Sequence, residues 1–493
     1  MMTDQRFAKQ VLVASVALAA AFVVAALAVG GYNNRLIAIA AAFAWLVFVR
    51  AHPAVGMATW LLAATDSVPF VRMSAASIPG SFRVEDVLIG ALMVAAGIEL
   101  ALGARRPSCL RVPKWLLVTS LIYLSWWLVT VVRTWAFGEV PLMSAILFGR
   151  DLTYIPLVAV AALIVLRRDS SPLKALNVIF AGAAVFSIGL IASVAFGVNA
   201  GLLVHSDLTG STGGLTRFYT PSHDLVTACF PILLWSTVFG RPWRRVVTIP
   251  LLLLLGSAIA LQLGRANYMA VVLGFAASVV LVGLVRLPAS RRYPRTGMVD
   301  IGGASLLIAA ALAGVGLAAG QGAFSSRIGG AVASRFGSLF SSGIGSDRNW
   351  SVRVKVAANI RRLLGGDWPW GLGFVHPKFN RFPILPASDL RNPDVGVLGT
   401  IAVMGAVGAV LQYLVVVGAC VSVFRHCLPG ERSSEALPVR LGILSFLIGT
   451  LVSSVTLVVL YTPGGAAIVG FIVALALCLA YGGASAPDGS RVG

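Results

Sequence analysis

The stretch GVLGTIAVMGAVGAVLQYLVVVGACVSVF, residues 396–424, contains no charged side chain and determines the class of this protein. A helix needs about 20 apolar residues to cross the hydrocarbon core of a bilayer, so this stretch is longer than one crossing requires. Because of this extra length we expect a partly re-entrant start, which would hold Asp394, the residue after Pro393, at the membrane rim.

Comparable apolar runs recur along the chain and predict an all-α integral membrane protein with about twelve to fourteen transmembrane helices. With residues 396–424, they give these predicted spans: 11–30, 35–49, 53–66, 86–103, 115–132, 143–166, 175–197, 223–239, 246–264, 267–286, 300–319, 396–424, 441–461 and 465–482. The N-terminal run follows MMTDQRFAK and lacks a small-residue cleavage site, which favours an uncleaved first helix over a signal peptide.

The composition excludes two other classes. Only 11% of the 493 residues are charged and 58% are hydrophobic, whereas a soluble domain carries about 25% charge. The net charge of +20 does not indicate nucleic acid, because Lys and Arg form short clusters between the apolar runs. The five cysteines are scattered singly and give neither a disulfide framework nor a metal site, and no cofactor is predicted.

Basic residues give the predicted orientation. The clusters that fall on one side, and therefore face the cytoplasm with both termini, are Arg105, Arg106, Arg111 and Lys114; Arg167, Arg168 and Lys174; Arg241, Arg244 and Arg245; Arg286, Arg291, Arg292 and Arg295; and Arg425, Arg432 and Arg440. The opposite side holds residues 320–395, a long loop that is also basic. We predict a scaffold at 1–200, a catalytic region at 201–424 that includes this loop, and C-terminal helices with a cytoplasmic tail at 425–493.

Part of the loop is predicted to be helical. SVRVKVAANIRRLL, residues 351–364, ends at Gly365–Gly366. Its apolar face is either Val352, Val356 and Ile360 or Val354, Ala358 and Leu363, with cations around it. Either this helix lies on the outer membrane surface, or its arginines bind an anionic substrate.

Two arginines outside the loop are candidates for binding such a substrate. Arg265, in LQLGRANYMA, lies at the outer end between two helices, where a charge is costly unless it faces a polar cavity or a partner. Arg217, in STGGLTRFYTPSHDLV, follows glycines that predict a pliable loop able to fold over a substrate. His223 beside it is interpreted as a helix-start residue rather than a catalyst.

Adjacent charges also interrupt the apolar stretch SAILFGRDLTYIPLV. Arg150 and Asp151 lie near the outer third of the predicted span, where they form either a self-satisfying structural pair or one edge of a polar cavity. Glu85 and Asp86 are interpreted as capping the outer end of another helix. Arg361 and Arg391 are further candidates to line the cavity.

The candidate general bases follow the basic helix. WPWGLG, residues 368–373, predicts a turn. Asp394 could take a proton from a sugar hydroxyl or cap the helix after it by bonding the amides of Gly396 or Val397, and both roles stay open. His376 is the competing base.

Four segments in this order resemble the O-antigen ligase and O-antigen polymerase superfamily of bacterial membrane glycosyltransferases. They are TRFYTPSHDLVTACFPIL (216–233), LQLGRANYMAVVLG (261–274), SVRVKVAANIRRLLGGDWPWGLG (351–373) and DVGVLGTIAVMGAVG (394–408). In the ligases the last segment usually begins His-Asn, with glycines eleven and fourteen residues on, and Asp394, Gly405 and Gly408 have this spacing. The resemblance covers residues 215–410.

The resemblance implies a GT-C-like scaffold that transfers a glycan from undecaprenyl diphosphate to an acceptor hydroxyl, with inversion and without a metal. It assigns diphosphate binding to Arg217, Arg265 and Arg353. Because Asp394 stands where the ligases have their presumed base, a histidine, the departure favours a polysaccharide polymerase over a ligase. The loop's acidic residues have no metal-binding spacing, in agreement with metal independence.

Two other functions would also fit a polytopic protein. A transporter or lipid flippase commonly has repeated halves with broken helices at matching positions, whereas the one large loop here has no counterpart before residue 200. A non-catalytic membrane scaffold would not need Arg265 at a helix end. The expected partners are a lipid-linked oligosaccharide, a glycan or lipid acceptor and membrane lipid, and no nucleic acid.

Overall fold

The computed structural model describes residues 44–67, 84–103, 112–138, 140–169, 171–196, 208–212, 215–219, 222–239, 242–262, 265–286, 348–374, 396–427, 436–454, 460 and 462–481. Its elements are α3 (Pro53–Ala64), α4 (Val84–Gly103), α5 (Lys114–Gly138), α6 (Leu142–Gly149), η2 (Arg150–Thr153), α7 (Tyr154–Leu166), α8 (Lys174–Phe196), β1 (Leu208–Thr212), β2 (Leu215–Tyr219), α9 (Ser222–Phe239), α10 (Pro242–Leu261), α11 (Arg265–Arg286), α14 (Arg348–Leu364), α16 (Val397–His426), α17 (Leu437–Ser453) and α18 (Pro463–Tyr481).

The helices confirm a multi-pass α-helical membrane protein. Within the described residues, six stretches are long and apolar enough to cross a membrane: Lys114–Phe137, Leu142–Leu166, Lys174–Val194, Ser222–Phe239, Val397–His426 and Pro463–Tyr481. The predicted spans 11–30 and 300–319, and most of 35–49, lie outside the described residues. The number of fourteen spans therefore stays a prediction.

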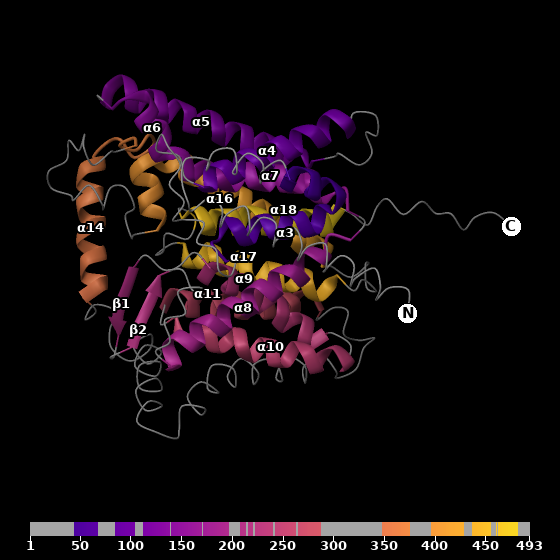
Figure 1. Ribbon diagram of the computed structural model, residues 1–493. Helices are drawn as coiled ribbons and strands as arrows, with labels where there is room; N and C mark the ends of the chain where they lie inside the picture. The colour runs from indigo at the N-terminus through magenta and orange to yellow at the C-terminus, as the bar shows by residue number, and fades with distance from the viewer. Residues whose placement is uncertain are drawn as a thin grey trace, which may run out of the picture.

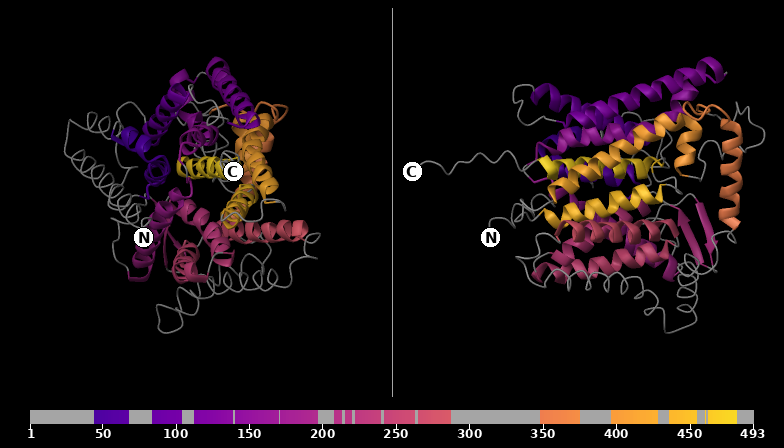
Figure 2. Two further views of the ribbon diagram at one scale, coloured as in Figure 1. Left: turned by 90° about the vertical axis from the view of Figure 1, so that its right-hand side faces the viewer. Right: turned by 180° about the vertical axis from the view of Figure 1, so that it is seen from behind.

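The helices pack side by side into one bundle with α18 in its interior (Figures 1 and 2). Nearly every residue of α18 is buried, and glycine and alanine recur along it. Small residues let helix backbones approach closely in a membrane. At Gly470 an added Cβ would lie 2.8 Å from the Cβ of Val158 in α7, so this contact depends on the glycine.

One continuous hydrophobic core joins α3 to α18. It includes buried residues from the predicted scaffold, such as Ile155, from the predicted catalytic region, such as Trp235, and from the C-terminal helices, such as Phe471. Helices from all three predicted segments thus share one core, and the division of function among the segments stays a prediction.

One end of the bundle gathers residues of the predicted cytoplasmic loops, and we name it the Arg440 end. The buried Arg440 side chain donates to the carbonyls of His426 and Leu479, at the last turns of α16 and α18. Arg168, after α7, pairs with Glu99 of α4 at 2.5 Å. These cations lie where the carbonyls of helix C-termini favour positive charge.

The opposite end, named the α14 end, carries α14 and a β-hairpin (Figures 1 and 2). There α14 lies across the direction of the bundle helices, with the hairpin near its N-terminal part. The basic helix predicted to end at Gly365–Gly366 is confirmed, because α14 ends at Leu364.

The hairpin corrects the prediction of a pliable loop around Arg217. Strands β1 and β2 pair antiparallel, with Thr212 opposite Leu215 and Gly210 opposite Arg217. Arg217 therefore lies in a strand of a hairpin, and Gly213 and Gly214 lie outside the described residues.

Candidate functional site

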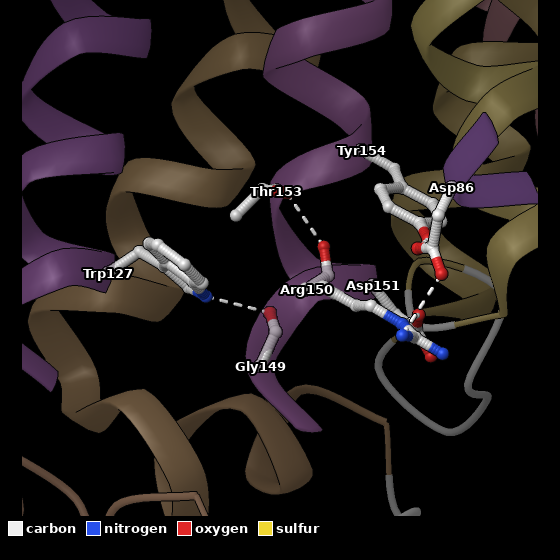
Figure 3. A network of polar contacts seen from close by, with 7 residues as sticks. All are labelled: Asp86, Trp127, Gly149, Arg150, Asp151, Thr153 and Tyr154. Carbon is white, nitrogen blue, oxygen red and sulfur yellow. Dashed lines mark hydrogen bonds and ion pairs between the residues drawn. The ribbon is translucent and has the colours of Figure 1, made fainter. Parts of the chain in front are cut away.

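The α6–η2–α7 segment is a candidate span in which the short 3-10 helix η2, called the break below, interrupts the α-helix while the backbone stays helical. Pro156 lacks the N–H that would bond the carbonyl of Leu152, and the hydroxyl of Tyr123 on α5 donates to that carbonyl instead, at 2.9 Å. The indole of Trp127 donates to the carbonyl of Gly149 at 2.8 Å (Figure 3). Side chains of α5 therefore satisfy backbone groups at the break.

The break places Arg150 against two carboxylates (Figure 3). The guanidinium lies 3.0 Å from Asp86, in the first turn of α4, and 3.8 Å from Asp151. Tyr154 donates its hydroxyl to Asp86 at 2.5 Å. The side chains of Arg150 and Asp86 are only 12% and 13% exposed, so this is a largely buried ion pair between helices.

This polar cluster corrects the interpretation of Asp86 as a helix cap alone, because Asp86 rather than Asp151 is the nearer partner of Arg150. Arg150 thereby joins α4 to the α6–η2–α7 segment, and a largely buried ion pair of this kind can serve as a structural link or as part of a polar cavity.

The second feature is a kink in α16 at Gly405, whose backbone has φ 73° and ψ 175°. The segment before the kink, residues 397–404, lies beside α14 at the end of the bundle (Figures 1 and 2). The rest of α16 runs in the direction of the other bundle helices. Ile360 and Leu364 of α14 form a small buried cluster with Ala402 of this segment. The predicted departure of residues 396–424 from a single straight crossing agrees with this kink.

The turn at residues 368–373 replaces the helical hydrogen bonds that the kink removes. The amides of Leu372 and Gly373 donate to the carbonyls of Ala402 and Val403 at 2.6 and 3.1 Å, and the amide of Ala406 donates to the carbonyl of Trp368 at 2.8 Å. The predicted WPWGLG turn is thus confirmed, and it fits into the broken helix. Its contacts leave no room for a Cβ at Gly405, which would collide with the Pro369 carbonyl.

Residues of α5 hold the turn and the kink together. The indole of Trp126 donates to the carbonyl of Met404 at 2.8 Å and stacks on Trp370 with ring centroids 5.1 Å apart. Arg133 donates to the carbonyl of Gly371, and the hydroxyl of Thr134 accepts from the amide of Phe374 at 2.9 Å. None of these residues was a sequence-based candidate, although a lone arginine beside an apolar run, Arg133, was a usable signal.

The two features share one small hydrophobic cluster. Tyr123, Leu152, Phe374 and Met404 are buried together, and the ring of Trp127 lies 6.4 Å from that of Phe374. A Cβ at Gly149 would lie 2.5 Å from the Phe374 ring, so the break and the turn fit closely here. The polar cluster and the basic helix therefore lie on one connected scaffold.

The arginines predicted to bind diphosphate lie in segments at the α14 end. Arg217 is in β2, Arg265 is the first residue of α11, and Arg353 is in the N-terminal half of α14. Only their backbone is described. Arg361 is exposed on α14. Both candidate bases, Asp394 and His376, and the candidate lining residue Arg391 lie outside the described residues. The first residue of α16 is Val397, preceded by Gly396 as its N-cap.

No protein-family model and no curated protein matches the sequence.

Proposed function

We propose that this protein is a cell-envelope glycosyltransferase that moves a glycan from an undecaprenyl-diphosphate carrier to an acceptor hydroxyl. The reaction would take place on the outer face of the cytoplasmic membrane, with inversion and without a metal. A GT-C-like scaffold of about fourteen helices belongs to the same proposal.

The observation that carries the proposal is that three arginine-bearing segments, distant in the sequence, share the α14 end: β2 with Arg217, the start of α11 with Arg265, and α14 with Arg353. By helical spacing, position 353 is on the face of α14 that carries Ile360 and packs against α16. Guanidinium groups pair with phosphate oxygens through parallel charge-assisted hydrogen bonds, which suits them to hold a diphosphate.

In the proposed step, the acceptor oxygen attacks the anomeric carbon of the carrier-linked sugar as the bond from that carbon to the diphosphate oxygen breaks. The hydroxyl proton goes to a general base, either Asp394 or His376. Undecaprenyl diphosphate leaves with its negative charge stabilised by the arginines. Asp394 lies two residues before the N-cap of α16. We favour it as the base because it occupies the position of the presumed base in the resembling family, and we favour polymerisation because the ligases have a histidine there.

The test is to incubate the purified protein with a lipid-diphosphate oligosaccharide. Products of increasing length identify a polymerase, and one transfer to a different acceptor identifies a ligase. We expect Arg265→Ala and Asp394→Ala each to abolish transfer while leaving membrane expression intact, whereas Arg425→Ala at the Arg440 end should keep full activity. Full activity in both of the first two variants would exclude the site assignment.

The alternative is a transporter or flippase for lipid-linked oligosaccharides, and the polar cluster favours it. Arg150 and Asp151 are charged residues in the 3-10 helix η2 inside a candidate span, and ion-coupling residues of transporters are likewise charged side chains within spans. With the same substrate, a flippase changes its sidedness without changing its chemistry. Asp151→Asn should then block movement of the lipid, whereas a glycosyltransferase should keep its transfer activity in this variant.

A further inference from the structure

The outward face of α14 is cationic. Val354, Lys355, Ala358, Arg361 and Arg362 are exposed, whereas the opposite face of the helix packs against α16. We name Lys355, Arg361 and Arg362 the cationic face. Within the part of the chain that the structure describes, none of these three side chains forms a hydrogen bond or ion pair. The helix carries no acidic residue, so this positive charge is not balanced within α14.

The position of α14 places this face at the membrane surface. Because α14 lies across the direction of the bundle helices, it runs roughly parallel to the plane of a membrane that they would cross (Figures 1 and 2). Its C-terminal end leads directly into the turn at residues 368–373, which is fixed to α5 through Arg133 and Thr134. The depth of the turn along α5 therefore gives the depth of Arg361 and Arg362.

The exposed apolar surface of α5 extends to the level of the turn at residues 368–373 and past it, toward the C-terminal end of α5. Around and past Thr134, α5 presents exposed apolar side chains, including Val132, Trp135 at 52% and Phe137 at 77%. Trp370 of the turn is 48% exposed, although its ring stacks on that of Trp126. Exposed tryptophans are typical of the boundary between hydrocarbon and headgroups. The cationic face therefore lies at headgroup level rather than in the aqueous phase above it.

We infer that the cationic face of α14 binds the headgroups of anionic phospholipids in the surrounding membrane. Its cations can pair with headgroup phosphates, while Trp370 and the outer part of α5 contact the adjoining acyl chains. The apolar face of α14 is already buried against α16, so the helix does not need to insert into the bilayer to satisfy it. This lipid site does not depend on glycan transfer, and its occupant differs from the diphosphate carrier.

A photo-crosslinking experiment tests the inference on this leaflet alone. A benzophenone amino acid replaces Ala358, which is exposed between Lys355 and Arg361 on α14. The full-length protein is placed in nanodiscs that contain phosphatidylcholine and phosphatidylglycerol, and the crosslinked lipids are identified by mass spectrometry. Because the crosslinker sits on α14, lipids bound at the Arg440 end do not contribute.

We expect crosslinked phosphatidylglycerol to exceed its share of the disc lipids. Each cation near an anionic membrane surface strengthens binding by a factor of about five, so the excess should disappear in the variant with Lys355→Gln, Arg361→Gln and Arg362→Gln. The matched control changes one lysine and two arginines that are exposed at the Arg440 end, with the substitutions Arg50→Gln, Lys114→Gln and Arg425→Gln. This control should keep the phosphatidylglycerol excess. Raising the salt concentration should reduce the excess in the unaltered protein.

Two results would overturn the inference: no phosphatidylglycerol excess in the unaltered protein, or an unchanged excess in the α14 variant. The assay contains no glycan donor, so it can fail while glycan transfer is intact, and it can succeed in a protein without transfer activity.

Discussion

Replacing Gly405 with alanine should separate the turn at residues 368–373 from α16. The φ and ψ angles of Gly405, 73° and 175°, belong to a region that residues with side chains rarely adopt. A Cβ at this position would also collide with the carbonyl of Pro369. Either the turn or the helix must therefore move.

The expected loss of stability follows from two contributions. Backbone strain of this kind costs about 1–3 kcal/mol. If the turn moves away, the hydrogen bonds made by the amides of Leu372, Gly373 and Ala406 are also lost, at about 0.5–1.5 kcal/mol each. We expect the free energy of unfolding to fall by about 2.5–7.5 kcal/mol, more than most single substitutions cause.

The assay is equilibrium unfolding of the purified protein in mixed micelles with increasing dodecyl sulfate, followed by circular dichroism. The near-ultraviolet signal of the stacked Trp126 and Trp370 reports directly on the turn. Gly97→Ala is the matched control, because a Cβ at Gly97 in α4 would meet no atom within 4 Å. If Gly405→Ala is no less stable than Gly97→Ala and keeps the tryptophan signal, the proposed fit of the turn into the kink is wrong.

Two further tests concern the break at η2. Asp86→Asn should lower the free energy of unfolding by about 2–4 kcal/mol, because it leaves the largely buried Arg150 without its nearer carboxylate. Asp151→Asn should lower it by less than half as much. Equal losses for the two variants in chemical denaturation would contradict the assigned pairing. Tyr123→Phe should cost about 1–3 kcal/mol, because it leaves the carbonyl of Leu152 without its donor; a variant as stable as the parent protein in the same measurement would contradict this role.

Much of the fold was predictable because membrane helices follow local rules. An apolar run long enough to cross the hydrocarbon core must form a helix to satisfy its backbone, and this predicted spans close to the observed α5, α8, α9 and α18. Helical periodicity and Gly365–Gly366 likewise predicted α14 and its end. Its apolar face is the one with Val356 and Ile360, and exposed Val354 excludes the alternative.

The candidate site was predictable only in part. A charge at the end of an apolar run singled out Arg265, a Gly-rich approach singled out Arg217, and the family resemblance alone singled out Arg353. Their role in binding diphosphate stays a prediction. These signals did not identify Asp86, whose partner Arg150 lies on another helix, because no local pattern distinguishes a helix cap from one member of an ion pair.

The sequence by itself determined that this is an α-helical membrane protein, where most of the helices that the structure describes lie, and that a basic helix and a turn precede α16, because each depends on residues close together in the chain. Only the tertiary structure decided how Gly405, Trp368 and Trp126 combine to break α16, and which carboxylate pairs with Arg150. The physical reason is that every broken helical hydrogen bond needs a substitute donor or acceptor, and packing alone determines which distant residue supplies it.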